Sequence, residues 1–451
     1  MSVSFTSLFR VPEIRKRILI TIGLLFCYRI GFAVPLPGVN YEKFQELAGS
    51  SGDGLGRLFS MMNVLTGAQL QQATIFSLGV MPYISASIIF SLLVKVLPSL
   101  ERLSKEGPSG QRKINQYTRL ATIPICLLQS FFVIYGVLAK GLGDPAASML
   151  YPGVANYWLL YVVIVMLSMT AGTMFIMWLG EQITEHGAGN GISLIIMAGI
   201  TAQLWPSFLQ YFNVGDNAMA TDAYQSLLLF VFAWGIAVVA VVFMTKSQRR
   251  IPIQQAKQTR GRKVYGGQRH FLPIKVNHAG VMPIIFASAL LLIPSLLGGA
   301  LGLTWLSDTF SRMDGFWYVA FYAALIFFFS FFWTSLMFQP HEMADNLKEH
   351  GSFVPGIRPG KQTAEFLEQT MLRITLAGAS FLTLVAVFPT FVSGSFAGLD
   401  TTLIYFMSGT SILIVVGVAL DLVEKLNAML IMRNYEGFMK ESGGQAGWGR
   451  R

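Results

Sequence analysis

Long apolar segments separated by short polar connections make up most of this chain. Ten of these segments have the length of roughly 20 residues that an α-helix needs to cross a bilayer. They lie at residues 18–34, 75–97, 120–138, 157–179, 192–209, 223–244, 279–297, 315–337, 372–392 and 401–422. The pattern predicts ten transmembrane helices, and the expected fold class is an all-α polytopic membrane protein.

One amphipathic stretch departs from this pattern. Residues 56–70 read GRLFSMMNVLTGAQL, which is too polar and too short to span, and they precede the second apolar segment. Half-length structure at membrane depth occurs only within protein or beside a water-filled cavity. The residues alone favour a helix lying on the outer leaflet; a segment resting inside a funnel is the alternative.

Composition and charge fix the class and the expected orientation. The chain has 451 residues, of which 53% are hydrophobic and 12% charged, and its mean hydropathy is +0.55. Of its 33 Lys and Arg residues, 26 fall on one side if the N-terminus is cytosolic, four fall on the other side, and three lie within or at the ends of spans. By the positive-inside rule both termini are expected in the cytosol. The basic start leads into a full apolar run without a cleavage pattern, so the first helix is expected to remain as an anchor.

The spans fall into two halves of five with opposite topology, which fits an inverted repeat around a central pathway. The predicted organisation is a cytosolic N-terminus at 1–17, an N-terminal half at 18–209, a C-terminal half at 223–422 with cytosolic loops at 245–278 and 338–371, and a cytosolic tail at 423–451.

The polar connections carry their own signals. Residues 246–277 alternate apolar and polar positions around basic turns, which predicts a β-ribbon or an extended loop. The second long loop is expected to begin as a helix and to end in a Pro/Gly-rich tip that carries Arg358. GAGNG at 187–191 is interpreted as a flexible turn, and the tail after Asn434 is expected to be disordered.

Several functions are disfavoured by what the spans lack. Their central parts carry no Asp, Glu, His or Lys, whereas an ion-coupled transporter normally needs such groups there. The five histidines lie in or beside loops, which opposes an intramembrane metalloprotease and a metal site. Phosphate-binding motifs are absent from the sequence, so no cofactor and no enzymatic activity are expected. Arg29 is the deepest charge, either reaching for the interface or packing against helix carbonyls.

Five long strings resemble the bacterial SecY family, the pore-forming subunits of the Sec protein translocation channel. They are VMPYISASIIF at 80–90, SGQRKINQYTR at 109–119, GTMFIMWLGEQITEHGAGNGISLII at 172–196, KVNHAGVMPIIFAS at 275–288 and ADNLKEHGSFVPGIRPGKQT at 344–363. The resemblance covers essentially the whole chain. It implies a passive protein-conducting channel of two pseudo-symmetric five-helix halves around an hourglass pore.

The resemblance also implies a plug and an aliphatic pore ring. The plug would occupy about 54–70, and its expected residues are Leu58, Phe59, Met61, Met62, Asn63, Val64 and Leu65. Asn63 would keep the segment tolerable in water, and the six apolar residues would seal the pore. The ring positions are Val80, Ile84, Ile192, Ile196, Ile285 and Ile414. The first two pairs are spaced four residues apart, which places each pair on one helix face. Periodicity alone favours lipid or packing contacts for these residues, and the resemblance favours the ring. Such a constriction excludes ions without binding any one side chain.

A lateral gate and partner contacts complete the expectation. The gate residues would be Ser87, Gln129 and Ser288, which are equally compatible with helix-to-helix hydrogen bonding. Implied partners are the SecE and SecG subunits, the SecA motor ATPase, the ribosome through its RNA phosphates, signal peptides, nascent chains and membrane lipid. Arg250, Lys257 and Arg358 are the expected docking contacts, although topology alone also explains cytosolic charge. The expected location is the bacterial inner membrane, with a plastid thylakoid as the alternative; a multi-pass secondary transporter is the alternative function.

Overall fold

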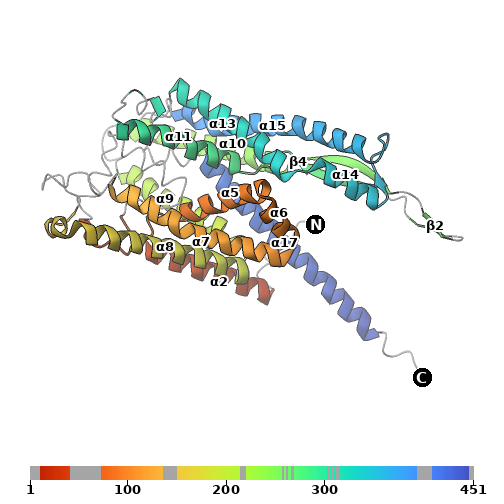
Figure 1. Cartoon of the computed structure of the whole chain (residues 1–451), viewed down its shortest axis with the longest axis horizontal. Coiled ribbons are helices and arrows are strands. Elements are labelled where there is room, and N and C mark those ends of the chain that lie inside the picture. Colours follow the sequence, from red (N-terminus) through yellow and green to blue (C-terminus); the bar gives the residue numbers. More distant parts are fainter. Residues whose placement is uncertain are drawn as a thin grey trace. The chain divides into compact units, whose positions relative to one another are not determined.

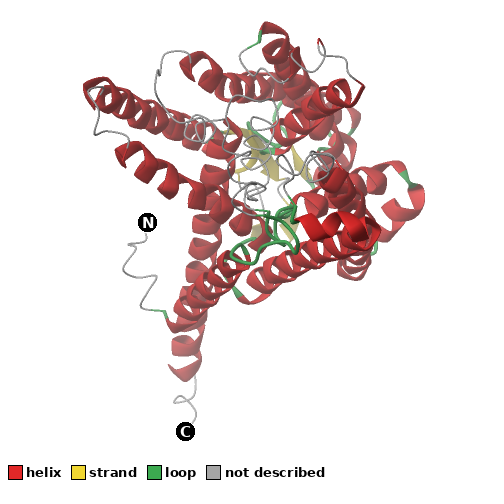
Figure 2. Ribbon diagram, turned by 90° about the vertical axis from the view of Figure 1, so that its left-hand side faces the viewer, coloured by secondary structure: helices red, strands yellow, loops and turns green. Residues whose placement is uncertain are grey.

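Helices form most of the part of the chain that the structure describes (Figures 1 and 2). The polar connections hold five short strands within this described part. The computed structural model describes residues 11–40, 73–135, 150–213, 220–255, 258–260, 263–265, 269–301, 305, 309–310, 315–393 and 409–445. Two compact units contain Met1–Leu209 with Val418–Arg451, and Gln210–Gly417. Each is described by itself.

The first unit is helical. Its elements are α2 (Pro12–Gly31), α5 (Met81–Val96), α6 (Pro98–Lys105), α7 (Pro108–Val133), the 3₁₀ turn η3 (Pro152–Tyr157), α8 (Trp158–His186), most of α9 (Gly191–Asn213) and the later part of α17 (Gly409–Gln445). Proline stands in the first turn of α2, α5, α6 and α7, where its missing N–H costs no hydrogen bond. In this unit α5 packs on α7, α7 on α8, and α8 on α2.

A sharp bend of 97° separates α5 from α6. Leu97 between them is extended, with φ −95° and ψ 114°. The following Pro98 disfavours the helical conformation at the residue before it, so α5 ends there and a new helix begins. Sequence periodicity predicted one segment from 75 to 97, and the bend explains why the helix stops at Val96.

The second unit holds α10 (Ala220–Lys246), β1 (Gln248–Gln255), β2 (Gln258–Arg260), β3 (Lys263–Tyr265), β4 (Arg269–Lys275), α11 (Met282–Leu301), α13 (Phe316–Met337), α14 (Pro340–Glu349), β5 (Ser352–Phe353), α15 (Lys361–Ser393) and the start of α17. Helix α13 packs against both α11 and α15. The ring of Phe286 stacks on Phe329 with centroids 5.2 Å apart and lies 5.6 Å from Trp333.

Apolar helices with exposed side chains mark this as a membrane protein. Among the described residues, four helices are long and apolar enough to cross a membrane, or five if the bent pair of α5 and α6 counts as one span. Leu159 of α8 and Phe316 of α13 are 81% and 77% exposed, as expected of side chains that face lipid. Each of the ten predicted apolar segments overlaps a helix within the described parts of the chain.

The expectation that the C-terminal tail is disordered was wrong in part. Helix α17 continues to Gln445, beyond Asn434 where disorder was expected. The sequence there, NYEGFMKE at 434–441, contains no proline and several strong helix formers, so the helix does not need an apolar face to continue. Hydropathy indicates which part of a helix lies in lipid, but it does not indicate the residue at which the helix ends.

Candidate functional site

The long basic connection folds into a two-stranded ribbon, as its alternating pattern predicted. Strands β1 and β4 pair antiparallel, with Arg250 opposite Pro273 and Ile251 opposite Leu272. Ile251 and Ile253 are buried, whereas Arg249 and Arg250 are exposed. The period of two along the strand thus places its isoleucines on a core and its Arg250 side chain in water.

Strands from the two polar loops pair in one sheet. The sequence analysis treated these loops as separate features. Strand β5 from the second loop pairs with β1, so the strand order is β4-β1-β5. A shared apolar core lies beneath the sheet: Ile251, Ile274, Phe338, Val354, Leu367, Met371 and Ile374 are its buried members. The two predicted docking arginines, Arg250 and Arg358, therefore project from one packed module.

The backbone around Arg358 is fixed. Thr363 Oγ1 donates a hydrogen bond of 2.9 Å to the carbonyl of Arg358. Gly356 and Gly360 on either side have φ of +84° and +101°, which residues with side chains adopt only at a cost. The Arg358 side chain is exposed, and within the described part of the chain it has no ion-pair partner. Lys257, the third predicted docking residue, lies outside the described residues.

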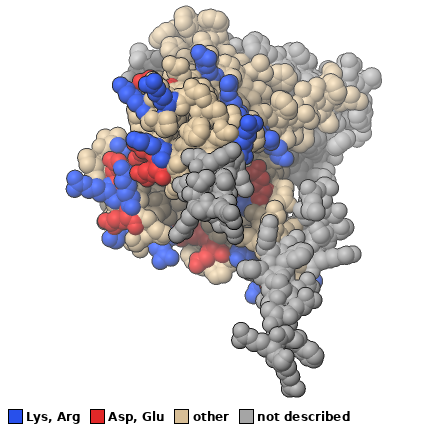
Figure 3. Space-filling model, turned by 90° about the vertical axis from the view of Figure 1, so that its right-hand side faces the viewer, with Lys and Arg blue, Asp and Glu red and all other residues tan. Residues whose placement is uncertain are grey.

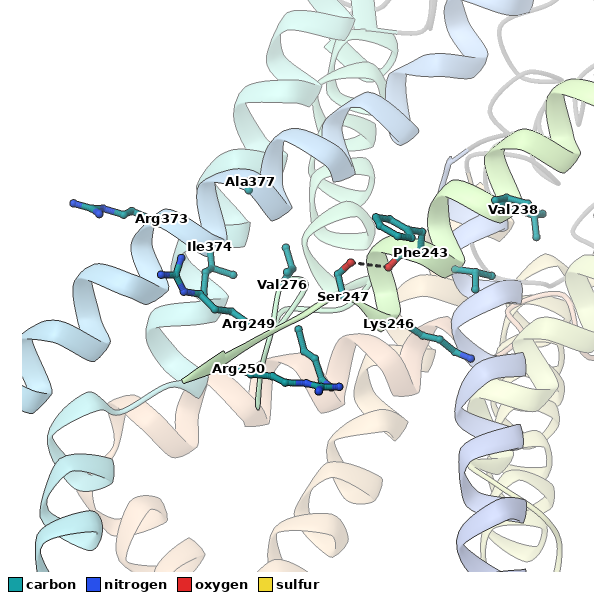
Figure 4. A pocket seen from close by; sticks show the side chains of 13 residues that line it. Val238, Phe243, Lys246, Ser247, Arg249, Arg250, Val276, Arg373, Ile374 and Ala377 are labelled. Carbon is teal, nitrogen blue, oxygen red and sulfur yellow. Dashed lines mark hydrogen bonds between the residues drawn. The ribbon is translucent and has the colours of Figure 1, made fainter. Parts of the chain in front are cut away.

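A pocket of about 990 Å³ opens where the ribbon meets α10 and α15 (Figure 4). Valines and Phe243 at the end of α10, Val276 after β4, and Ile374 and Ala377 of α15 form its apolar walls. Lys246, Arg249, Arg250 and Arg373 line it as cations. Figure 3 shows Lys and Arg side chains together with Asp and Glu side chains on the face that it views.

The six predicted ring residues lie on four helices or at their ends. Val80 caps α5, and its carbonyl accepts the Ile84 N–H at 3.0 Å, so this pair shares a helix face. Ile192 and Ile196 lie one turn apart on α9, and a Cβ at Gly180 would lie 2.9 Å from Ile192 Cγ1. Ile192 therefore contacts α8. Ile285 of α11 and Ile414 of α17 belong to the second unit. Convergence of the six on one axis stays a prediction.

The three predicted gate residues lie on three different helices, which are α5 for Ser87, α7 for Gln129 and α11 for Ser288. Ser288 is 3% exposed, and its hydroxyl donates within its own helix to the carbonyls of Ile284 at 2.9 Å and Ile285 at 3.0 Å. The Ser87 carbonyl accepts from Ser91 Oγ at 2.7 Å. Gln129 on α7 is partly buried. Both of these hydrogen bonds stay within α11, so among the described residues they do not tie Ser288 to another helix. The role of the three residues in a lateral gate stays a prediction. The plug residues at 54–70 lie outside the described residues.

The structure favours the interpretation of Arg29 as a residue at the end of a helix. It stands in the last turn of α2, is exposed, and its guanidinium carbon lies 5.9 Å from the Phe32 ring centroid. A cation near a helix C-terminus is favoured by the helix dipole, and the aromatic face adds an attraction.

Sequence reasoning missed an ion pair between α7 and α8. Arg119 Nε lies 2.5 Å from Glu181 Oε1, and the side chains are 47% and 25% exposed. Both residues stand in quoted strings, but a 62-residue separation gives no local signal of pairing. The pair joins two helices that pack against each other.

The GAGNG turn is fixed, and its interpretation as flexible was wrong. The Ala188 N–H donates to Thr21 Oγ1 at 3.0 Å, and Arg17 Nη1 donates to the Gly187 carbonyl at 3.2 Å. A Cβ at Gly187 would lie 2.5 Å from Thr21 Oγ1. The glycines therefore permit close approach to α2, and flexibility is not their use here.

The same turn closes on α8. A Cβ at Gly191 would lie 1.9 Å from the Gly180 carbonyl oxygen, closer than any side chain can come. Ile14, Ala188, Leu426 and Leu430 form a buried cluster beside it. In the part of the chain that the structure describes, no group of three His, Cys, Asp or Glu side chains could hold a metal ion.

Comparison with known proteins identifies the family. The SecY family model matches residues 74–423. A protein translocase subunit SecY from Streptomyces griseus is 41% identical over 445 residues, covering 98% of this chain and all of the relative. The chain belongs to the SecY family. Membership confirms the expected class, a non-enzymatic subunit of the protein translocase, and excludes the secondary transporter.

Solved structures agree with the SecY fold. A protein-conducting channel has a TM-score of 0.60 at 18% identity, covering 95% of this chain and 97% of the other. Canine Sec61 in the ribosome–channel complex from the endoplasmic reticulum has a TM-score of 0.56 at 16% identity, with 95% and 97% covered. At these identities the likeness concerns the fold.

Proposed function

We propose that this chain forms the pore through which the translocase passes unfolded secretory polypeptides and from which it releases transmembrane segments into lipid. The observation that carries the proposal is the SecY match along nearly the full length of the chain. In this proposal ten helices span the bacterial inner membrane in two inverted halves of five, with both termini in the cytosol. The charge bias of the sequence supports that orientation.

The proposed pore uses aliphatic side chains at the six ring positions. Such a constriction excludes ions, yet it can widen around a passing chain because it makes no directional bonds. The plug at about 54–70 would cover it, and the seam containing Ser87, Gln129 and Ser288 would open sideways. An apolar segment of ~20 residues then partitions into lipid because its transfer from water is favourable.

The proposed docking module is the three-stranded sheet with Arg250 and Arg358, together with Lys257. Canine Sec61 is seen in a ribosome–channel complex. Contact with ribosomal RNA phosphates or with SecA suits exposed arginines that form no ion pair among the described residues. SecE and SecG are the proposed membrane partners, and signal peptides and nascent chains are the substrates.

Photocrosslinking tests the pore. A photoreactive group at Ile84 or Ile196 should capture a stalled secretory chain. Ile89, which lies on the same helix as Ile84 and is 46% exposed, provides the matched control and should capture lipid. Capture of the secretory chain at Ile89 but not at Ile84 would reject the pore assignment.

A further inference from the structure

Residues 73–80 form a buried double turn directly before α5. All but one of these eight residues are buried, although connections between helices normally lie at the surface. The Ser77 N–H donates to the Thr74 carbonyl at 3.0 Å, and the Ser77 hydroxyl donates to the same carbonyl at 2.6 Å. The Gly79 N–H donates to the Phe76 carbonyl at 2.8 Å. The segment is therefore ordered by its own hydrogen bonds.

A short antiparallel bridge ties the start of this segment to the chain that follows α2. The Leu36 N–H donates to the Ala73 carbonyl at 2.8 Å. The Ile75 N–H donates to the Val34 carbonyl at 3.1 Å. Ala73 between these bonds has φ +43°, a conformation that residues with side chains rarely adopt. Such strain persists only where the surrounding structure determines the backbone, and the bridge does so here.

Helices α2 and α8 clamp the middle of the segment. A Cβ at Gly31 of α2 would lie 1.8 Å from Phe76 Cε2, so the Phe76 ring rests directly on the backbone of that helix. A Cβ at Gly172 of α8 would lie 2.4 Å from the Ile75 carbonyl oxygen. Three further rings surround that of Phe76: Tyr28, Phe32 and Phe175, with centroids 6.4, 5.7 and 6.1 Å away. Movement of the segment would break all of these contacts together.

We propose that residues 73–79 are a fixed anchor, which positions the ring residue Val80 and stays joined to residues 34–36 while a polypeptide is translocated. Val80 is 2% exposed, and its carbonyl accepts the Ile84 N–H at the start of α5. Because the anchor holds the backbone directly before α5, a displacement of the chain before residue 73 is not transmitted to Val80. The inference rests on the proposed function, which assigns Val80 and Ile84 to the pore ring.

A disulfide across the bridge tests the anchor. Pro35 lies opposite Thr74, and the two bridge hydrogen bonds flank this pair. In a non-hydrogen-bonded antiparallel pair the Cα atoms are ~4.5 Å apart, a distance that a disulfide can span. Among the described residues Thr74 Oγ1 has no hydrogen-bond partner, so a sulfur there removes none. The double variant Pro35→Cys, Thr74→Cys is made in a background with Cys27→Ala and Cys126→Ala.

Export is compared before and after oxidation of this variant. The complete translocase is reconstituted in vesicles with SecA and a secretory precursor. The oxidised variant should export within about twofold of the reduced one, because a disulfide restrains only movements that separate the residues it joins. A loss of about tenfold or more that reverses on reduction would overturn the proposal, since translocation would then require the bridge to open. The background chain reports on the proposed function: absence of export there would contradict the pore and not the anchor.

The clamp is tested without export. Gly172→Ala places a Cβ against the Ile75 carbonyl, so it should push the segment from the bridge and slow oxidation of the engineered pair about fivefold or more. The matched control is Gly23→Ala in α2, where a Cβ meets nothing within 4 Å, and it should leave the oxidation rate unchanged. Equal oxidation rates in the two glycine variants would overturn the proposal, because α8 would then not hold the segment.

Discussion

Gln254 of β1 lies opposite Phe353 of β5, and this pairing joins the two polar connections of the second unit into one sheet. The consequence is that Arg250 and Arg358, which are more than 100 residues apart in sequence, share one apolar core beneath them. A partner that contacts both meets a surface whose geometry is set by the fold. Docking there does not require two independent loops to be ordered on binding.

Removing Arg358 should therefore impair motor-driven export more than insertion of short membrane proteins. We expect Arg358→Gln to lower the rate of SecA-dependent export by about threefold or more, because a rim charge acts chiefly on association. Export of a secretory precursor and insertion of a short membrane protein are compared in proteoliposomes. Arg269→Gln, at an exposed position of the same sheet, is the control. Equal loss in both assays would count against a docking role.

The sequence predicted the positions of the helices well and their mutual packing poorly. Apolar runs locate helices because burial in lipid requires uninterrupted hydrophobic length. They did not reveal β5, since a strand of two residues has no period to detect. Nor did they reveal the pairing of Arg119 with Glu181, which depends on which helices become neighbours.

The glycine-rich turn at 187–191 shows a second limit of prediction from the sequence. GAGNG was interpreted from composition as flexible, because glycine is permissive wherever it stands. In the structure the same residues are the points at which the turn touches α2 and α8. Composition cannot separate these two uses of glycine, because close packing becomes visible only when the neighbouring helix is placed.

Substitution of Gly191 should destabilise the protein strongly. A Cβ there would lie 1.9 Å from the Gly180 carbonyl oxygen, so α8 and α9 must move apart. We expect Gly191→Ala to cost about 2–3 kcal/mol, typical of an overpacked site. The matched control is Gly417→Ala in α17, where a Cβ meets nothing within 4 Å. Thermal unfolding in detergent compares the two, and an unfolding temperature of G191A equal to that of G417A would contradict the packing argument.

The protein should become less stable as the pH decreases below about 6.5, because of the titration of His278. Burial, followed by the nearby Lys275 charge, lowers the pKa of His278 below its usual value. The unfolded chain then binds a proton that the folded chain resists, so stability is lost as pH falls from 6.5 through the folded-state pKa. His278→Gln should flatten the dependence of the unfolding temperature between pH 5 and pH 7. The substitution His270→Gln, in the same ribbon, leaves His278 in place and should keep the slope. If H278Q retained the full slope, the titrating group would have to be another.

The Arg119–Glu181 pair should couple α7 to α8 more strongly than a surface pair does. Glu181 is only 25% exposed, so solvent screens the attraction less than at the Lys425–Asp421 pair, whose side chains are 44% and 51% exposed. A double-mutant cycle with Arg119→Met and Glu181→Gln should give about 0.5–1 kcal/mol, against about 0.3–0.5 kcal/mol for the helical surface pair. Free energies of unfolding are measured in bicelles by steric trapping. If both cycles gave the same coupling, partial burial would add nothing to this contact.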